Sequence, residues 1–99
     1  MDDGVRDPGR LSDNAGKDAA FLAGWLALRY LKDAKLAEPH FEAMKKAADG
    51  PLSRAKASYW LGRTADAKGD KTAAEAHYRD AMLDGDTFHG QLARLKLEP

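Results

Sequence analysis

The sequence has no cysteine, no excess of charge of either sign and no long hydrophobic run. Without cysteine the chain forms no disulfide and offers no thiolate for catalysis or metal binding. Its 16 basic and 16 acidic residues cancel to a net charge of 0. No overall electrostatic field therefore draws nucleic acid or an anionic membrane surface to it. With 99 residues, the chain is one small domain or a piece of a larger one.

The most apolar segment, residues 19–31, is 13 residues long and contains Arg29. A membrane-spanning helix needs about 20 apolar residues, so this segment is too short to cross a bilayer. Residues 1–18 carry three basic and five acidic side chains, unlike the positive flank of a signal peptide. We expect no membrane span and no signal peptide in this chain, and we interpret residues 19–31 as a buried helix.

Residues 1–17 are rich in Asp, Gly, Arg and Asn and contain no aromatic residue. Such a segment buries too little apolar surface to offset its ordering entropy, which predicts a disordered N-terminal tail. Beyond it, apolar residues recur every three or four positions between Gly, Pro and Asp stops. This pattern predicts five helices, over residues 18–31, 34–48, 51–68, 71–83 and 88–97. Because proline lacks an amide donor, Pro39 predicts that the second helix starts late or bends.

Two stretches share residue types in the same order and predict an internal repeat. The matching positions are Phe21, Gly24, Asp33, Ala37, His40 and Phe41 in the first unit, and Tyr59, Gly62, Asp70, Ala74, His77 and Tyr78 in the second. The offset is 38 up to the glycine and 37 from the aspartate onward, so we place a one-residue slip in the intervening turn. Glycine inside a helix costs about 1 kcal/mol, so Gly24 and Gly62 predict close helix packing.

The second unit resembles a tetratricopeptide repeat, with small and large residues at that family's packing positions. These residues are Leu61, Gly62, Ala65, Ala74, Tyr78 and Ala81. The unit departs from the pattern in Ser58, where a large aromatic is usual, and in Asp86, where proline is common. The resemblance implies an all-α domain over residues 18–99. We expect this domain to contain hairpins over 18–49 and 51–84 and an unpaired helix over 87–97. These units would stack as a short right-handed α-solenoid. Because such arrays usually need about three repeats, we expect self-association through exposed repeat ends, or docking against segments of a larger parent protein.

Residues 18–97 resemble the α-superhelical region that precedes the catalytic domain of the soluble lytic murein transglycosylases. The segments that carry the resemblance are Ala19–Arg29, His40–Phe41, Ala57–Arg63, Ala74–Tyr78 and Thr87–Ala93. It implies a periplasmic parent enzyme that cleaves peptidoglycan with a glutamate in a Glu-Ser pair. None of the four glutamates here precedes a serine, so we expect no catalytic residue in this chain.

Two function classes follow. By resemblance, the chain is a non-catalytic scaffold that contacts peptidoglycan or the rest of a parent lytic transglycosylase. The alternative is an independent tetratricopeptide-type adaptor that binds an extended peptide or a protein partner.

The candidate contact residues are large aromatic and cationic side chains on the predicted helices. Trp25 and Trp60 are suited to stack on sugar rings, although large aromatics at helical spacing more often pack in a core. Arg29 and Arg63 interrupt apolar helices, and we favour structural ion pairing for them over a binding role. The histidines have no further ligands at metal-binding spacing, so we expect neither a metal nor a cofactor.

Overall fold

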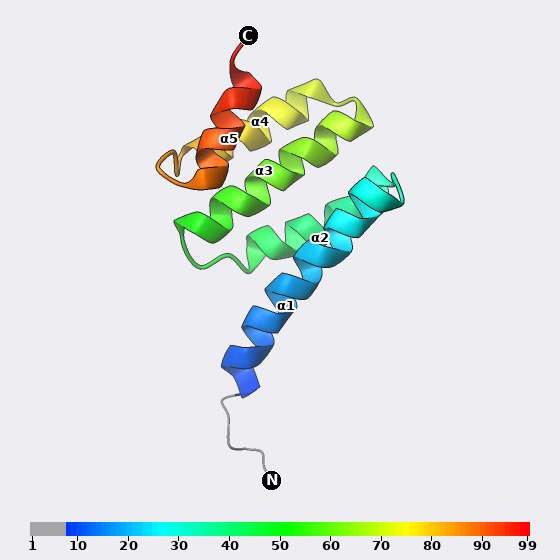
Figure 1. Cartoon of the computed structure of the whole chain (residues 1–99), viewed down its shortest axis with the longest axis vertical. Helices are drawn as coiled ribbons and strands as arrows, with labels where there is room; N and C mark the ends of the chain where they lie inside the picture. Colours follow the sequence, from blue (N-terminus) through cyan, green and yellow to red (C-terminus); the bar gives the residue numbers. More distant parts are fainter. Residues whose placement is uncertain (1–7) are drawn as a thin grey trace.

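The computed structural model of the chain describes residues 8–99, a range that contains helices and turns and no strand (Figure 1). The helices are α1 (Pro8–Trp25), the π-helix η2 (Leu26–Tyr30), α2 (Ala34–Lys46), α3 (Pro51–Lys68), α4 (Lys71–Met82) and α5 (Phe88–Leu97). The predicted all-α class is confirmed.

Helix α1 begins at Pro8, well before the start predicted at Asp18. Proline suits a first helical turn, because its missing N–H has no partner there in any case. A helix that has been nucleated then extends by one hydrogen bond per residue. Residues 8–17 are thus helical, contrary to the prediction of a tail, and the prediction for residues 1–7 lies outside the described residues. In Figure 1 this first part of α1 extends away from the other helices.

The helices follow one another as neighbours in space. Helix α2 runs back along α1 and η2, α3 packs against α2, and α4 runs back along α3 (Figure 1). Helix α5 packs against both α3 and α4. The arrangement leaves α1, α3 and α5 together on the side of the molecule that faces the viewer in Figure 1.

The helix ends follow from local sequence signals. Asp33 and Asp70 cap α2 and α4, with side-chain oxygens that accept hydrogen bonds from Leu36 N and Ala73 N, each at 3.0 Å. Gly69 ends α3 with φ 81°, in the left-handed region where glycine is favoured. The boundary between α3 and α4 was predicted correctly, with one helix ending at residue 68 and the next beginning at residue 71. Helix α2 does not start late: its first turn is intact and Pro39 lies inside it.

Each hairpin is closed by one glycine that lies against one aromatic ring. A Cβ placed on Gly24 would be 2.7 Å from Cε1 of Phe41, and one placed on Gly62 would be 2.6 Å from Cδ1 of Tyr78. These two pairs are the matching positions of the sequence repeat, and real Cβ atoms do not approach other atoms so closely. The glycines are therefore required by packing, as predicted.

Gly90 is a further glycine that has no room for a Cβ, but its neighbours are different. Gly90 lies in the first turn of α5, where a Cβ would collide with the carbonyl oxygen of Asp84. Its neighbours are the preceding turn and Thr87, which caps α5 through a 3.0 Å bond from Gly90 N. Position 90 is thus not equivalent to positions 24 and 62.

The one-residue slip between the repeats lies inside the first helix and not in the turn. The N–H of Asp33 donates to Ala27 O at 2.8 Å, whereas in the second unit the N–H of Asp70 donates to Ala65 O at 2.9 Å. The segment closed by this hydrogen bond is longer by one residue in the first unit, and the extra residue is absorbed in the π-helix η2, which has a wider turn than an α-helix. Lys32 then takes the place of Gly69, with φ 58°.

Two apolar clusters form the core, one on each side of α3. The first contains Phe41, Leu61 and neighbours from η2 and α2, and the second contains Tyr59, Tyr78 and neighbours from α4 and α5. The predicted repeat positions Ala37, Ala65, Ala74 and Ala81 are all buried.

The outer sides of the first and last helices are open. The exposed apolar side chains there are Leu22, Trp25, Leu26 and Tyr30 on α1 and η2, and Phe88 and Leu95 on α5. The interpretation of residues 19–31 as a helix covered on most sides is wrong, because α2 covers one side and no described helix covers the other.

Candidate functional site

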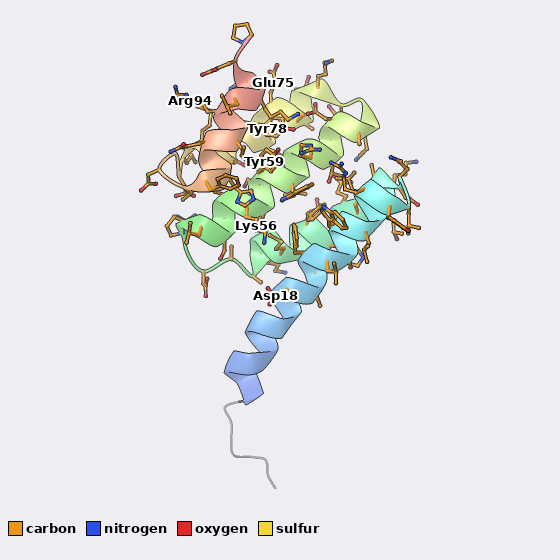
Figure 2. The ribbon with its side chains drawn as sticks, in the orientation of Figure 1. Asp18, Lys56, Tyr59, Glu75, Tyr78 and Arg94 are labelled. Carbon is orange, nitrogen blue, oxygen red and sulfur yellow. The ribbon has the colours of Figure 1, made fainter. Side chains whose placement is uncertain are left out.

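The side of α3 that lies between α1 and α5 carries two cationic and two aromatic side chains. It presents Lys56, Tyr59, Trp60 and Arg63, which are spaced by three or four residues and so share a helix face. Figure 2 shows Lys56 and Tyr59 along α3 between the two neighbouring helices, with Tyr78 contributed by α4. We call Lys56, Tyr59, Trp60 and Arg63 the α3 face.

The ring of Trp60 is engaged by its neighbours. Phe41 stacks on it at 5.9 Å between ring centroids, with an interplanar angle of 25°, and Phe21 meets it edge-on at 5.8 Å. The Arg63 guanidinium carbon lies 5.2 Å from the ring centroid of Trp60. Trp60 is therefore a packing residue between α1, α2 and α3, and of its two sequence interpretations the core role fits this arrangement.

Tyr59 joins α3 to α4 and α5. Its ring lies 5.9 Å from that of Tyr78 and 5.6 Å from that of His89. Tyr78 in turn donates a 2.6 Å hydrogen bond to Asp66 Oδ2. Burial and this bond raise the pKa of Tyr78 far above its ordinary range, so the phenol stays protonated as a donor.

Lys56 lies over an aromatic ring and has no carboxylate partner among the described residues. Its Nζ is 4.0 Å from the centroid of the Phe21 ring, a cation–π distance. Burial lowers the pKa of His89, and the positive charge of Lys56 lowers it further. His89 is thus neutral at pH 7, and Lys56 is the cation of this part of the α3 face.

Arg63 is held in place by two aromatic residues. Its Nη1 donates to the Tyr59 hydroxyl at 3.0 Å, and its guanidinium carbon lies over the rings of Trp60 and Tyr59. The side chain is half-buried and makes no ion pair with a described residue. The structural ion pairing that we favoured for Arg63 is therefore replaced by ring stacking and a hydrogen bond to a neutral hydroxyl.

Arg29 and Arg63 line one hollow of about 360 Å³ between η2 and the second half of α3. Its other lining residues are Leu28, Lys32, Asp66 and Ala67. Arg29 makes no ion pair with a described residue either, so the pairing favoured for it is also not found. Three cationic side chains thus converge with a single carboxylate, and that carboxylate already accepts the Tyr78 hydrogen bond.

Sequence reasoning singled out Arg29 and Arg63 separately and did not place them together. Trp25, the fourth candidate, is 37% exposed on α1 and is not among the residues that line the hollow. Lys32, Lys56 and Asp66 were missed. The left-handed backbone at Lys32 had one available signal, its alignment with Gly69 in the repeat.

On other surfaces some of the charged residues form ion pairs between separate elements. Lys45–Asp80 at 3.0 Å and Lys68–Glu38 at 2.9 Å each link two helices, and Arg54–Asp84 at 3.1 Å links α3 to the turn after α4. The hydrogen bond to Glu38 raises the pKa of Lys68. Lys45 and Lys68 thus each have a carboxylate partner on another helix.

The histidines do not form a metal centre. Burial lowers the pKa of His77, the nearby Lys45 lowers it further, and its Nδ1 is buried without a hydrogen-bond partner. Within residues 8–99 no three His, Cys, Asp or Glu side chains gather as metal ligands would.

Comparisons with protein-family models, with curated proteins and with solved structures found no match to the chain. Over residues 8–99, none of the helices has the length and apolar character needed to cross a bilayer.

Proposed function

We propose that the chain is a non-catalytic helical-repeat interaction module whose α3 face contacts an extended partner. One observation carries the proposal. Lys56 and Arg63 are positioned by aromatic rings and lack carboxylate partners among the described residues, whereas five cations elsewhere are paired with carboxylates. Cations held in place and left without counter-charge favour binding over a purely structural role.

We also propose that the two hairpins and α5 are consecutive units of a right-handed tetratricopeptide-like solenoid. The equivalent glycine–aromatic pairs, Gly24 with Phe41 and Gly62 with Tyr78, support this arrangement. The equivalent caps at Asp33 and Asp70 support it as well. In such a solenoid the first helices of successive units line one continuous surface, which here is formed by α1, α3 and α5.

The larger protein that we propose for this module is a lytic transglycosylase of the periplasm, with peptidoglycan as the partner. This proposal depends on the resemblance of residues 18–97. Reading the gene past the codon for Pro99 tests it: a lysozyme-like segment with a Glu-Ser pair supports the parent enzyme, and a stop codon favours the independent adaptor.

Binding is tested by co-sedimentation of the purified chain with insoluble peptidoglycan, and in parallel by selection from a displayed library of random peptides. We expect retention by one of the two, reduced in Lys56→Ala and unchanged in Lys46→Ala, an exposed lysine on α2. Equal loss in the two variants, or no retention of the original chain, contradicts the α3 face as a binding surface. Release of soluble muropeptides contradicts a non-catalytic role.

Self-association through the open ends is proposed as a property of the isolated chain. The exposed apolar side chains of α1 and η2 lie at one end of the helix order and those of α5 at the other. Sedimentation velocity at micromolar concentration checks it, with Leu26→Lys and Leu95→Lys as variants that we expect to shift the chain toward monomer. A compact monomer for the original chain rejects it.

A further inference from the structure

We propose that the hollow between η2 and α3 binds a carboxylate group of an extended peptide, held by Arg29, Lys32 and Arg63. The inference builds on the proposed function, because it names the chemical group that one end of the α3 face recognises. It depends on four observations: the positions of the three cations, their lack of counter-charge, the fixed geometry of Arg63, and the local departure of the backbone from the repeat.

The three cations come from separate parts of the chain. Arg29 belongs to η2, Lys32 to the turn after it, and Arg63 to α3, and all three line one hollow of about 360 Å³. A guanidinium presents several N–H donors in a planar fork that matches the two oxygens of a carboxylate. Two guanidiniums and an ammonium around one hollow therefore suit a single planar anion.

The charge of the hollow is not neutralised within the described residues. Asp66 is its one acidic lining residue, and the hydrogen bond from Tyr78 at 2.6 Å occupies one of its oxygens. None of the three cations makes an ion pair with a described residue. An incoming carboxylate thus meets an excess of positive charge in a shallow, open hollow whose cations come from two sides.

Arg63 is pre-organised for this task. The Tyr59 hydroxyl accepts from Nη1 at 3.0 Å, and the guanidinium lies over the Trp60 ring at 5.2 Å. These contacts hold the side chain and leave its other donors free, so less side-chain entropy is lost when an anion binds. Because Phe41 and Arg63 already engage the ring of Trp60, the site offers cations to a partner and not an open aromatic platform for a sugar.

The backbone around the hollow is where the first repeat departs from the second. The π-turn of η2 and the positive φ of Lys32, 58°, both fall here, and the second unit has regular α-helix and Gly69 instead. A π-turn inside a helix and a non-glycine residue in the left-handed region each cost free energy and occur often at functional sites. The segment with these two departures is the one that carries Arg29 and Lys32 to the hollow that Arg63 also lines.

The test uses the whole isotopically labelled chain and hexaglutamate as the carboxylate probe, at constant ionic strength, followed by NMR through the arginine Nε–Hε signals. We expect the signals of Arg29 and Arg63 to move together with one dissociation constant. Arg29→Gln and Arg63→Gln should each weaken binding by about tenfold or more, the value of a charge-assisted hydrogen bond. Arg63→Lys keeps the charge without the fork and should lie between the original chain and Arg63→Gln.

The matched control is Arg79→Gln, which removes the same charge from an exposed side chain on α4 that pairs with Glu75. It should change the affinity less than about twofold, since it acts only through the weak field of a screened surface charge. Equal weakening by Arg79→Gln and Arg63→Gln overturns the proposal, as do unmoved arginine signals. Binding of inorganic phosphate by the same residues without binding of hexaglutamate also overturns it.

These outcomes are separate from those of the proposed function. If hexaglutamate does not bind the hollow, the retention of a partner through Lys56 is unaffected. Failure of the proposed function abolishes that retention in the original chain, whatever hexaglutamate does.

Discussion

The ring of Tyr78 occupies the space into which any side chain at position 62 would project. A Cβ on Gly62 would lie 2.6 Å from Cδ1 of that ring. In the first unit, a Cβ on Gly24 would lie 2.7 Å from Cε1 of Phe41. The Tyr78 ring is buried, and its hydroxyl is fixed by Asp66. The ring therefore cannot move aside without loss of the 2.6 Å bond.

Substitution of Gly62 by alanine should therefore destabilise the fold. Overpacking costs about 1–3 kcal/mol and the better helix propensity of alanine returns about 1 kcal/mol, so we expect a net loss of about 1 kcal/mol. Urea unfolding followed by circular dichroism measures it. Gly16→Ala is the control, because no atom lies within 4 Å of a Cβ there, and it should stabilise α1 slightly. Destabilisation by Gly16→Ala and not by Gly62→Ala contradicts the packing argument.

Lys32→Gly should stabilise the protein and weaken the carboxylate site. Lys32 has φ 58°, a conformation that costs an L-residue about 1–2 kcal/mol. Glycine adopts this conformation without that cost, but its greater freedom in the unfolded chain cancels part of the gain in stability. We expect a gain of about 0.5–1 kcal/mol in thermal or urea unfolding. Gly69→Ala, at the equivalent position with φ 81°, should show the opposite sign. A loss of stability in Lys32→Gly would mean that the lysine side chain supports the turn.

The free energy of unfolding should fall as the pH drops below about 6.5, in part through His77. Burial, and then Lys45, lower its pKa in the folded protein below the ordinary 6.5. Asp80, Glu38 and Glu42 oppose this shift. The unfolded chain therefore binds a proton first as the pH falls, so the stabilisation is complete above 6.5 and is lost on descent toward the folded pKa.

His77→Gln should flatten this part of the stability–pH curve, measured by urea unfolding between pH 7.5 and 5. Some slope should remain, because burial and Lys56 lower the pKa of His89 in the same way. His77→Gln and His89→Gln combined should remove more of the slope than either alone. An unchanged slope in the double variant excludes both histidines as its source.

Tyr78→Phe should cost about 1.5–3 kcal/mol, the usual value of a hydrogen bond to a charged group in a folded protein. It removes the 2.6 Å bond to Asp66 and keeps the ring that packs against Gly62. Asp66→Asn, combined with it in a double-mutant cycle, isolates the pair. Additive effects of the two changes show that the bond contributes nothing to stability.

The helix ends and the repeat were predictable because their signals are local. Gly69 and Asp70 act through their own backbone and side chain, and the glycine–aromatic pairs recur in matching order along the chain. The extent of α1 was not predictable from burial, since residues 8–17 extend a helix that is anchored elsewhere.

The candidate site was predictable only in part. Arg29 and Arg63 each stood out as charges in apolar helices, but they are far apart in sequence, and their meeting depends on how η2 packs against α3. The ring contacts that replace the expected ion pairing of Arg63 lie within α3, with Trp60 three and Tyr59 four residues before it, and that spacing was a signal available in the sequence.

The π-helix shows how this architecture tolerates changes in length. One residue more in the first unit than in the second leaves the aspartate cap and the glycine–aromatic contact of that unit in place, because the wider turn of η2 takes up the difference. If the two units descend from one ancestor by duplication, a single-codon insertion or deletion was absorbed within one turn without shifting the hairpin. The interior of a helix, and not only a loop, then becomes a place where such a protein acquires a difference between otherwise equivalent units.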